Sequence, residues 1–186
     1  MNSDNLIIVQ TAKWISDVVI GCNFCPFAAR EIDKGSVVYI VVNSKDLKAV
    51  LESLSRAFEQ LDIDTKIETI LLIIPKGFQS FSAYLQLLAL SESFLQKEGY
   101  EGIYQVASFH PEYLFANALY NDPSNYTNRS PYPMLHLLRE QSVSHAIENF
   151  PGTENIPEKN IKFTKAKGLL HMQNLLKACL EIQQKK

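Results

Sequence analysis

The sequence predicts an α/β or α+β domain in which helices cover a sheet of three or more mostly parallel strands. Three apolar segments, SVVYIVV at 36–42, KIETILLIIP at 66–75 and GIYQVASF at 102–109, have the composition of buried strands. Helical patterns separate them, and crossovers of this length favour parallel pairing in a βαβαβ core. Because further helical patterns flank this core, we expect helical N- and C-terminal segments within a single domain over 1–186.

The N-terminal part is expected to be helical. Apolar residues recur near helical spacing over about 5–20, and Gly21 follows as a helix stop. In the next segment, CNFCPFAAR, Pro26 forces Cys25 toward extended geometry. A short helical turn is expected over 28–32.

Amphipathic patterns predict the helices after the first strand. In the first of them apolar residues recur at i, i+3 and i+4, with charged residues on the opposite face. Prolines tolerated in a first turn open the last two. These helices are expected over about 45–61, 80–98, 131–148 and 157–182, the last with a possible split at Gly168.

Composition narrows the classes of partner. A net charge of -2 and a pI near 6.1 argue against a protein that binds the nucleic-acid backbone. No apolar run approaches the roughly 20 residues that span a bilayer, and no secretion leader is recognisable. Three cysteines in such a chain read as reduced thiols. We therefore expect a cytoplasmic protein without a nucleic-acid or membrane partner.

The CNFCP segment holds two cysteines, Cys22 and Cys25, at i and i+3. This spacing fits a redox dithiol or half of a zinc site, and it equally fits buried structural thiols. A structural zinc site needs a second pair, whereas Cys179 lies among apolar neighbours and reads as a core residue. Cys25 could still act alone, because Pro26 fixes its backbone.

The third expected strand ends at His110, because Pro111 must terminate the ladder. Ligands of open parallel sheets bind outside the carboxyl ends of the strands. His110 is therefore a candidate for proton transfer near neutral pH. The alternative is a histidine whose ring bonds a loop carbonyl and holds the turn.

The loop NYTNRSPYPM carries a candidate anion site. Ser130 is a plausible helix cap and Pro131 fills the first helical position. Arg129, just ahead of the cap, offers a rigid fork that fits a carboxylate or phosphate. Asn125 and Asn128 could orient the ligand.

His136 and Arg139 lie at i and i+3 of the expected helix over 131–148 and could extend the same polar site. The alternative is an ordinary amphipathic helix in which Arg139 and Glu140 form ion pairs.

Four segments resemble a bacterial domain-of-unknown-function family, number 1415. They are VIGCNFCPFA at 19–28, QVASFHPEYLFA at 105–116, NYTNRSPYPMLHLLRE at 125–140 and, more weakly, EKNI at 158–161. The resemblance implies no settled activity. This sequence departs from the family pattern at Cys22, where the family commonly has leucine. Cys25 therefore remains the thiol of interest. The family motif falls on His110, Glu112, Asn125, Asn128, Arg129, His136, Arg139 and Glu140.

These features predict a pocket at one sheet edge that binds a small anionic metabolite, without a cofactor. Arg129 would clamp the anion, His110 would move a proton, and Cys25 would be a nucleophile or a wall. A second hypothesis is a non-catalytic binding or assembly module in which the NRSPYP motif is a structural clasp. A third is a metal site drawing on Cys25, His110 and His136.

Overall fold

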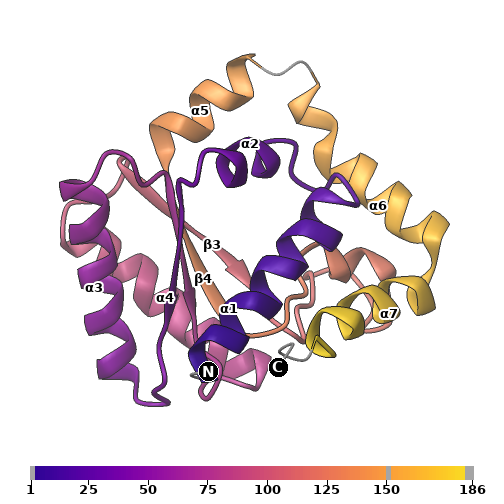
Figure 1. Cartoon of the computed structure of the whole chain (residues 1–186), viewed down its shortest axis with the longest axis horizontal. Helices are drawn as coiled ribbons and strands as arrows, with labels where there is room; N and C mark the ends of the chain where they lie inside the picture. Colours follow the sequence, from indigo (N-terminus) through magenta and orange to yellow (C-terminus); the bar gives the residue numbers. More distant parts are fainter. Residues whose placement is uncertain (1–2, 150–151, 183–186) are drawn as a thin grey trace.

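The computed structural model describes residues 3–149 and 152–182. It has an α+β fold built on a four-stranded mixed sheet in the order β1-β2-β4-β3 (Figure 1). The strands are β1 (Val37–Val41), β2 (Thr69–Ile73), β3 (Tyr104–Phe109) and β4 (Met134–Arg139).

The sheet is mixed, so the expectation of mostly parallel strands is wrong. β1 and β2 pair in parallel, but β4 lies between β2 and β3 and runs antiparallel to both. The prediction of a helix over 131–148 is also wrong in its first half. Residues 134–139 form β4, and the helix begins only at Glu140. Leu135 and Leu137 of β4 are fully buried between neighbouring strands and helices, which stabilises the strand over a helix.

Most of the other expected helices are present. Asp46 and Ser80 accept hydrogen bonds from backbone N–H groups and so cap the two crossover helices. Gly168, with a φ of 82°, separates the last two helices as the sequence predicts. The α-helices are α1 (Ser3–Trp14), α2 (Ala28–Asp33), α3 (Leu47–Ile63), α4 (Phe81–Lys97), α5 (Glu140–Asn149), α6 (Ile156–Lys167) and α7 (Leu169–Leu180). A π-helix, η1 (Ile15–Ile20), continues α1, and η2 (Pro123–Thr127) and η3 (Thr153–Asn155) are short 3-10 helices.

Helices cover both faces of the sheet (Figure 1). Alternate residues of β2 enter different apolar layers, as the twofold period of a strand requires. Ile70 and Leu72 pack with α3 and α4, whereas Leu71 and Ile73 face α1 and α7. No helix within 3–149 and 152–182 is long and apolar enough to cross a membrane.

The face of the sheet that packs against α1 and α7, called the second face below, is covered less completely at one end. There α2 lies beside the sheet, and α5, which follows β4 directly, stands at the top of Figure 1 away from the main layers. No residue of α2 or α5 is buried. Side chains of both helices border a cavity of about 820 Å³.

Candidate functional site

A cavity of about 820 Å³ lies between the second face of the sheet and the helices α2 and α5. We call it the sheet-face cavity. Its floor comes from all four strands, and its walls come from η1, the 25–34 segment and α5. The floor residues are Val37, Thr69, Leu71, Gln105, Ala107, Phe109, His136 and Leu138.

Strand register explains the shape of this floor. His136 of β4 pairs with Leu71 of β2 on one side and with Ala107 of β3 on the other. All three line the cavity. Because the methyl group of Ala107 is short, the imidazole of His136 has open space beside it rather than a packed neighbour.

The imidazole of His136 has a side-chain hydrogen bond and a ring contact. Its Nε2 lies 2.6 Å from Oγ1 of Thr69, which also donates to the backbone oxygen of Leu137 at 2.6 Å. The ring of Phe109 lies 5.9 Å from the imidazole, centroid to centroid. Desolvation by burial lowers the pKa of His136 to about 4, so the ring is neutral at pH 7.

The charged groups around the cavity largely pair with one another. Lys34 Nζ lies 3.1 Å from Oε1 of Glu31, and Arg30 Nε lies 3.6 Å from the same oxygen. Glu68 and Glu148 also border the cavity. The lining thus offers no surplus of positive charge to an anion.

Cys25 lines the sheet-face cavity and is partly buried. Burial raises the pKa of its thiol, although the backbone N–H groups of Phe27 and Ala28 act in the opposite direction. The thiol is therefore protonated at neutral pH and is a weak nucleophile.

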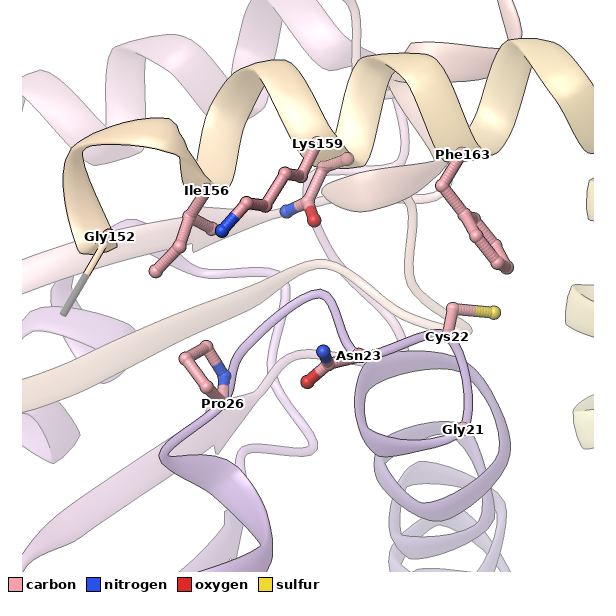
Figure 2. A pocket seen from close by; sticks show the side chains of 9 residues that line it. Gly21, Cys22, Asn23, Pro26, Gly152, Ile156, Lys159 and Phe163 are labelled. Carbon is pink, nitrogen blue, oxygen red and sulfur yellow. The ribbon is translucent and has the colours of Figure 1, made fainter. Parts of the chain in front are cut away.

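Cys22 faces a different, smaller cavity of about 300 Å³. Figure 2 shows Ile156, Lys159 and Phe163 of the C-terminal part across from the segment that carries Cys22 and Pro26. The two cysteines of the CNFCP segment thus line separate cavities, and all three cysteines are free thiols.

Arg129 is nearly buried, with 5% of its surface exposed. Nε donates to the backbone oxygen of Tyr113 at 3.1 Å, and Nη2 donates to that of Tyr120 at 2.9 Å. The rings of Tyr120 and Tyr126 each lie 4.8 Å from its Cζ atom. We call this arrangement, with the side chains of Asn125 and Asn128 beside it, the arginine clasp.

The two asparagines bind backbone groups. Asn125 is fully buried, donates to the oxygen of Leu119 at 2.8 Å and accepts from the N–H of Phe115 at 3.1 Å. Asn128 donates to the oxygen of Ser108 at 3.2 Å. Together they fix the loop between β3 and β4.

His110 lies on the opposite side of the sheet from His136. It is fully buried; its Nε2 lies 3.0 Å from the oxygen of Phe78, and Nδ1 accepts from the N–H of Glu112 at 2.9 Å. Its ring packs against Tyr84 of α4, at 5.0 Å between centroids. Burial lowers the pKa of His110.

Arg139 ends β4 far from the clasp. Its Nε donates to the oxygen of Ile67 at 3.1 Å, and Nη2 donates to that of Leu61 at 2.5 Å. These bonds join β4 to the C-terminal end of α3 and to the segment between α3 and β2.

Of the seven residues expected to share a site, Cys25 and His136 line the sheet-face cavity. The other five, His110, Asn125, Asn128, Arg129 and Arg139, lie outside that lining. Within the described part of the chain, no group of three or more His, Cys, Asp or Glu side chains is arranged to hold a metal ion.

Sequence reasoning missed Thr69, Gln105 and Ala107 as parts of the floor. Each belongs to a strand, and only the pairing of β2 and β3 with β4 places them around His136. One signal in the sequence points to this floor: a histidine inside the apolar run MLHLL is unusual and indicates a polar group at a cavity.

A family model described as "Protein of unknown function (DUF1415)" matches residues 6–174. The chain belongs to this family. No curated protein and no solved structure matches the chain. The DUF1415 region includes the whole lining of the sheet-face cavity and the arginine clasp.

Proposed function

We propose that the chain binds a small, mainly apolar organic molecule in the sheet-face cavity. Its volume of about 820 Å³ lies within the range of small-molecule sites, roughly 300–1,000 Å³. Val37, Leu71, Phe109 and Leu138 supply an apolar floor. Such a floor with few polar groups is typical of ligand pockets.

The observation that carries the proposal is the state of the two polar side chains on this floor. Nδ1 of His136 and the side-chain amide of Gln105 have no hydrogen-bond partner among the residues that the structure describes, yet both line the cavity. Among the described residues every buried side-chain nitrogen and oxygen has a hydrogen-bond partner, so these two unpartnered groups are accessible within the cavity and available to a ligand.

The anion clamp expected at Arg129 receives less support than this cavity. Two backbone oxygens and two tyrosine rings already occupy its guanidinium. We therefore propose that the NRSPYP motif acts as a structural clasp, in which Arg129 binds backbone oxygens of its own loop, residues 113–130. Cys25, protonated through burial, serves as a wall of the cavity rather than as a nucleophile.

A neutral solvatochromic dye, prodan, tests the binding proposal by fluorescence titration. The wild-type chain is expected to bind it, with a blue-shifted emission from an apolar environment. Ala107→Leu fills the floor beside His136 and is expected to weaken binding about tenfold, since the added side chain takes the ligand's space. Ala89→Leu is the matched control, because Ala89 is exposed on α4 at the opposite face of the sheet.

Two results would count against the proposal. One is no binding of prodan to the wild-type chain. The other is equal loss of affinity in the Ala107→Leu and Ala89→Leu variants.

A further inference from the structure

The hydroxyl group of Thr69 fixes the proton positions around His136. A threonine hydroxyl has one proton, and Oγ1 of Thr69 has two neighbours at 2.6 Å, the oxygen of Leu137 and Nε2 of His136. The carbonyl oxygen can only accept, and two oxygens this close need a proton between them. The Thr69 proton therefore goes to Leu137, and Nε2 of His136 must donate.

The opposite ring nitrogen then carries a lone pair. In a neutral imidazole one nitrogen donates and the other accepts, so a proton on Nε2 leaves Nδ1 as an acceptor. Burial keeps the His136 ring neutral at pH 7, with a pKa of about 4. Nδ1 has no partner within residues 3–149 and 152–182, and His136 lines the cavity.

We infer that the sheet-face cavity selects a neutral, ring-bearing ligand with an O–H or N–H group, which donates a hydrogen bond to Nδ1 of His136. This inference rests on the binding proposed above and names the class of its ligand. The ring requirement comes from the aromatic wall, where Phe109 packs edge-on against Trp14 at 5.1 Å and lies 5.9 Å from the imidazole.

Gln105 supplies a second contact to such a ligand. Ala107 pairs with His136, and Gln105 pairs with Leu138, so Gln105 and His136 are diagonal neighbours on adjacent strands. Side chains in that relation are within reach of one molecule that lies over Ala107. The amide of Gln105 can accept or donate, so it tolerates a second polar group of either kind.

The same geometry disfavours an anion. A carboxylate beside Nδ1 would face a lone pair unless His136 took up a proton, and with a pKa of about 4 roughly one ring in 1,000 is protonated at pH 7. The other charged groups that line the cavity do not compensate, because the three carboxylates Glu31, Glu68 and Glu148 outnumber Arg30 and Lys34. Cys25 and His145 are the remaining titratable side chains of the lining.

Three two-ring probes of similar size test the inference by competition with prodan: 1-naphthol, 1-methylnaphthalene and 1-naphthoate. We expect the wild-type chain to bind 1-naphthol about threefold to tenfold more tightly than 1-methylnaphthalene, the effect of one hydrogen bond. We expect 1-naphthoate to bind most weakly of the three. His136→Phe keeps a ring but removes the acceptor, and is expected to abolish the preference for 1-naphthol.

A second pair of variants tests the role of Thr69 without removing the imidazole. Thr69→Val removes the oxygen that accepts from Nε2, so the tautomer is no longer fixed and the preference for 1-naphthol is expected to decrease. Thr69→Ser retains the hydroxyl and is expected to keep it.

The possible failures are distinguishable. If 1-naphthoate binds the wild-type chain as tightly as 1-naphthol does, or if the preference for 1-naphthol survives in His136→Phe, the inference is overturned while ligand binding stands. An undiminished preference in Thr69→Val overturns the assignment of the tautomer to Thr69. If prodan binds the wild-type chain but none of the three probes displaces it, the inference is overturned while ligand binding stands. If prodan does not bind either, the proposed function fails as well.

Discussion

Oγ1 of Thr69 lies 2.6 Å from Nε2 of His136, so a side chain of β2 determines which nitrogen of a β4 imidazole carries the proton. We predict that long-range proton–nitrogen NMR spectra will show a protonated Nε2 and an unprotonated Nδ1 at pH 7. On acidification the ring should titrate with a pKa of about 4. A protonated Nδ1, or titration near 6.5, would contradict the assignment.

The lowered pKa of His136 predicts a loss of stability in mild acid. The unfolded chain takes up a proton near pH 6.5, whereas the folded ring does so only at about 4. The contribution of His136 to the free energy of unfolding is therefore fully present above pH 6.5 and decreases by about 2 to 3 kcal/mol as the pH falls to 4. Urea denaturation at pH 7 and pH 4.5 measures this decrease.

His136→Phe is the control for the pH effect and should show a smaller decrease between the two pH values. Some decrease will remain, because burial lowers the pKa of His110 as well and acts in the same direction. An identical decrease in the wild-type chain and the variant would show that His136 does not contribute.

Truncation of the arginine clasp is expected to destabilise the fold. In Arg129→Ala the carbonyl oxygens of Tyr113 and Tyr120 lose their donors, and two tyrosine rings lose the guanidinium between them. We predict a loss of about 2 to 4 kcal/mol in the free energy of unfolding. Arg30→Ala is the matched control, expected to change it by less than about 0.5 kcal/mol, because that side chain is 69% exposed.

Calorimetry or urea denaturation of both arginine variants decides the clasp hypothesis. If Arg129→Ala were as stable as Arg30→Ala, the guanidinium would have to be free for another role, and the anion clamp would regain support.

Cysteine alkylation should follow access to the thiols. Cys25 is partly buried at the sheet-face cavity, whereas Cys179 is fully buried and donates from Sγ to the oxygen of Leu175 at 3.2 Å. Burial raises the pKa of Cys179 to about 11 and also raises that of Cys25. With iodoacetamide and mass spectrometry, we predict that Cys25 is modified faster than Cys179 but more slowly than a free model thiol.

A rate at Cys25 above that of the free thiol would instead indicate an activated nucleophile. Protection of Cys25 by prodan would link its modification to occupation of the cavity.

The sequence predicts well the elements with a clear local period. The helix predicted over 45–61 agrees with α3 to within two residues at each end. The agreement is close because an apolar stripe opposite a polar face is typical of a surface helix. The sequence predicts a helix where β4 lies, because MLHLLR is apolar on both faces and follows prolines that suit a helix start. A short apolar run of this kind does not distinguish a buried strand from a buried helix.

The candidate site is harder to predict from the sequence, because its residues meet only when β4 is recognised as a strand. His136 was grouped with Arg139 by helical spacing, but in a strand the two residues point to opposite faces. The pairing of β4 with β2 and β3 is a long-range property, and it alone brings Thr69 and Ala107 to His136. The sequence marks the polar loop around Arg129 as unusual, but the bonds from its guanidinium to the oxygens of Tyr113 and Tyr120 depend on the folded path of the loop.

The most direct test of the account is NMR mapping of 1-naphthol on the isotope-labelled wild-type chain. We predict saturable shifts of the methyl groups of Leu71, Ala107 and Leu138, which surround His136 on the cavity floor. No shifts at saturating probe, or shifts confined to residues around Arg129, would contradict the claim that the sheet-face cavity is the binding site.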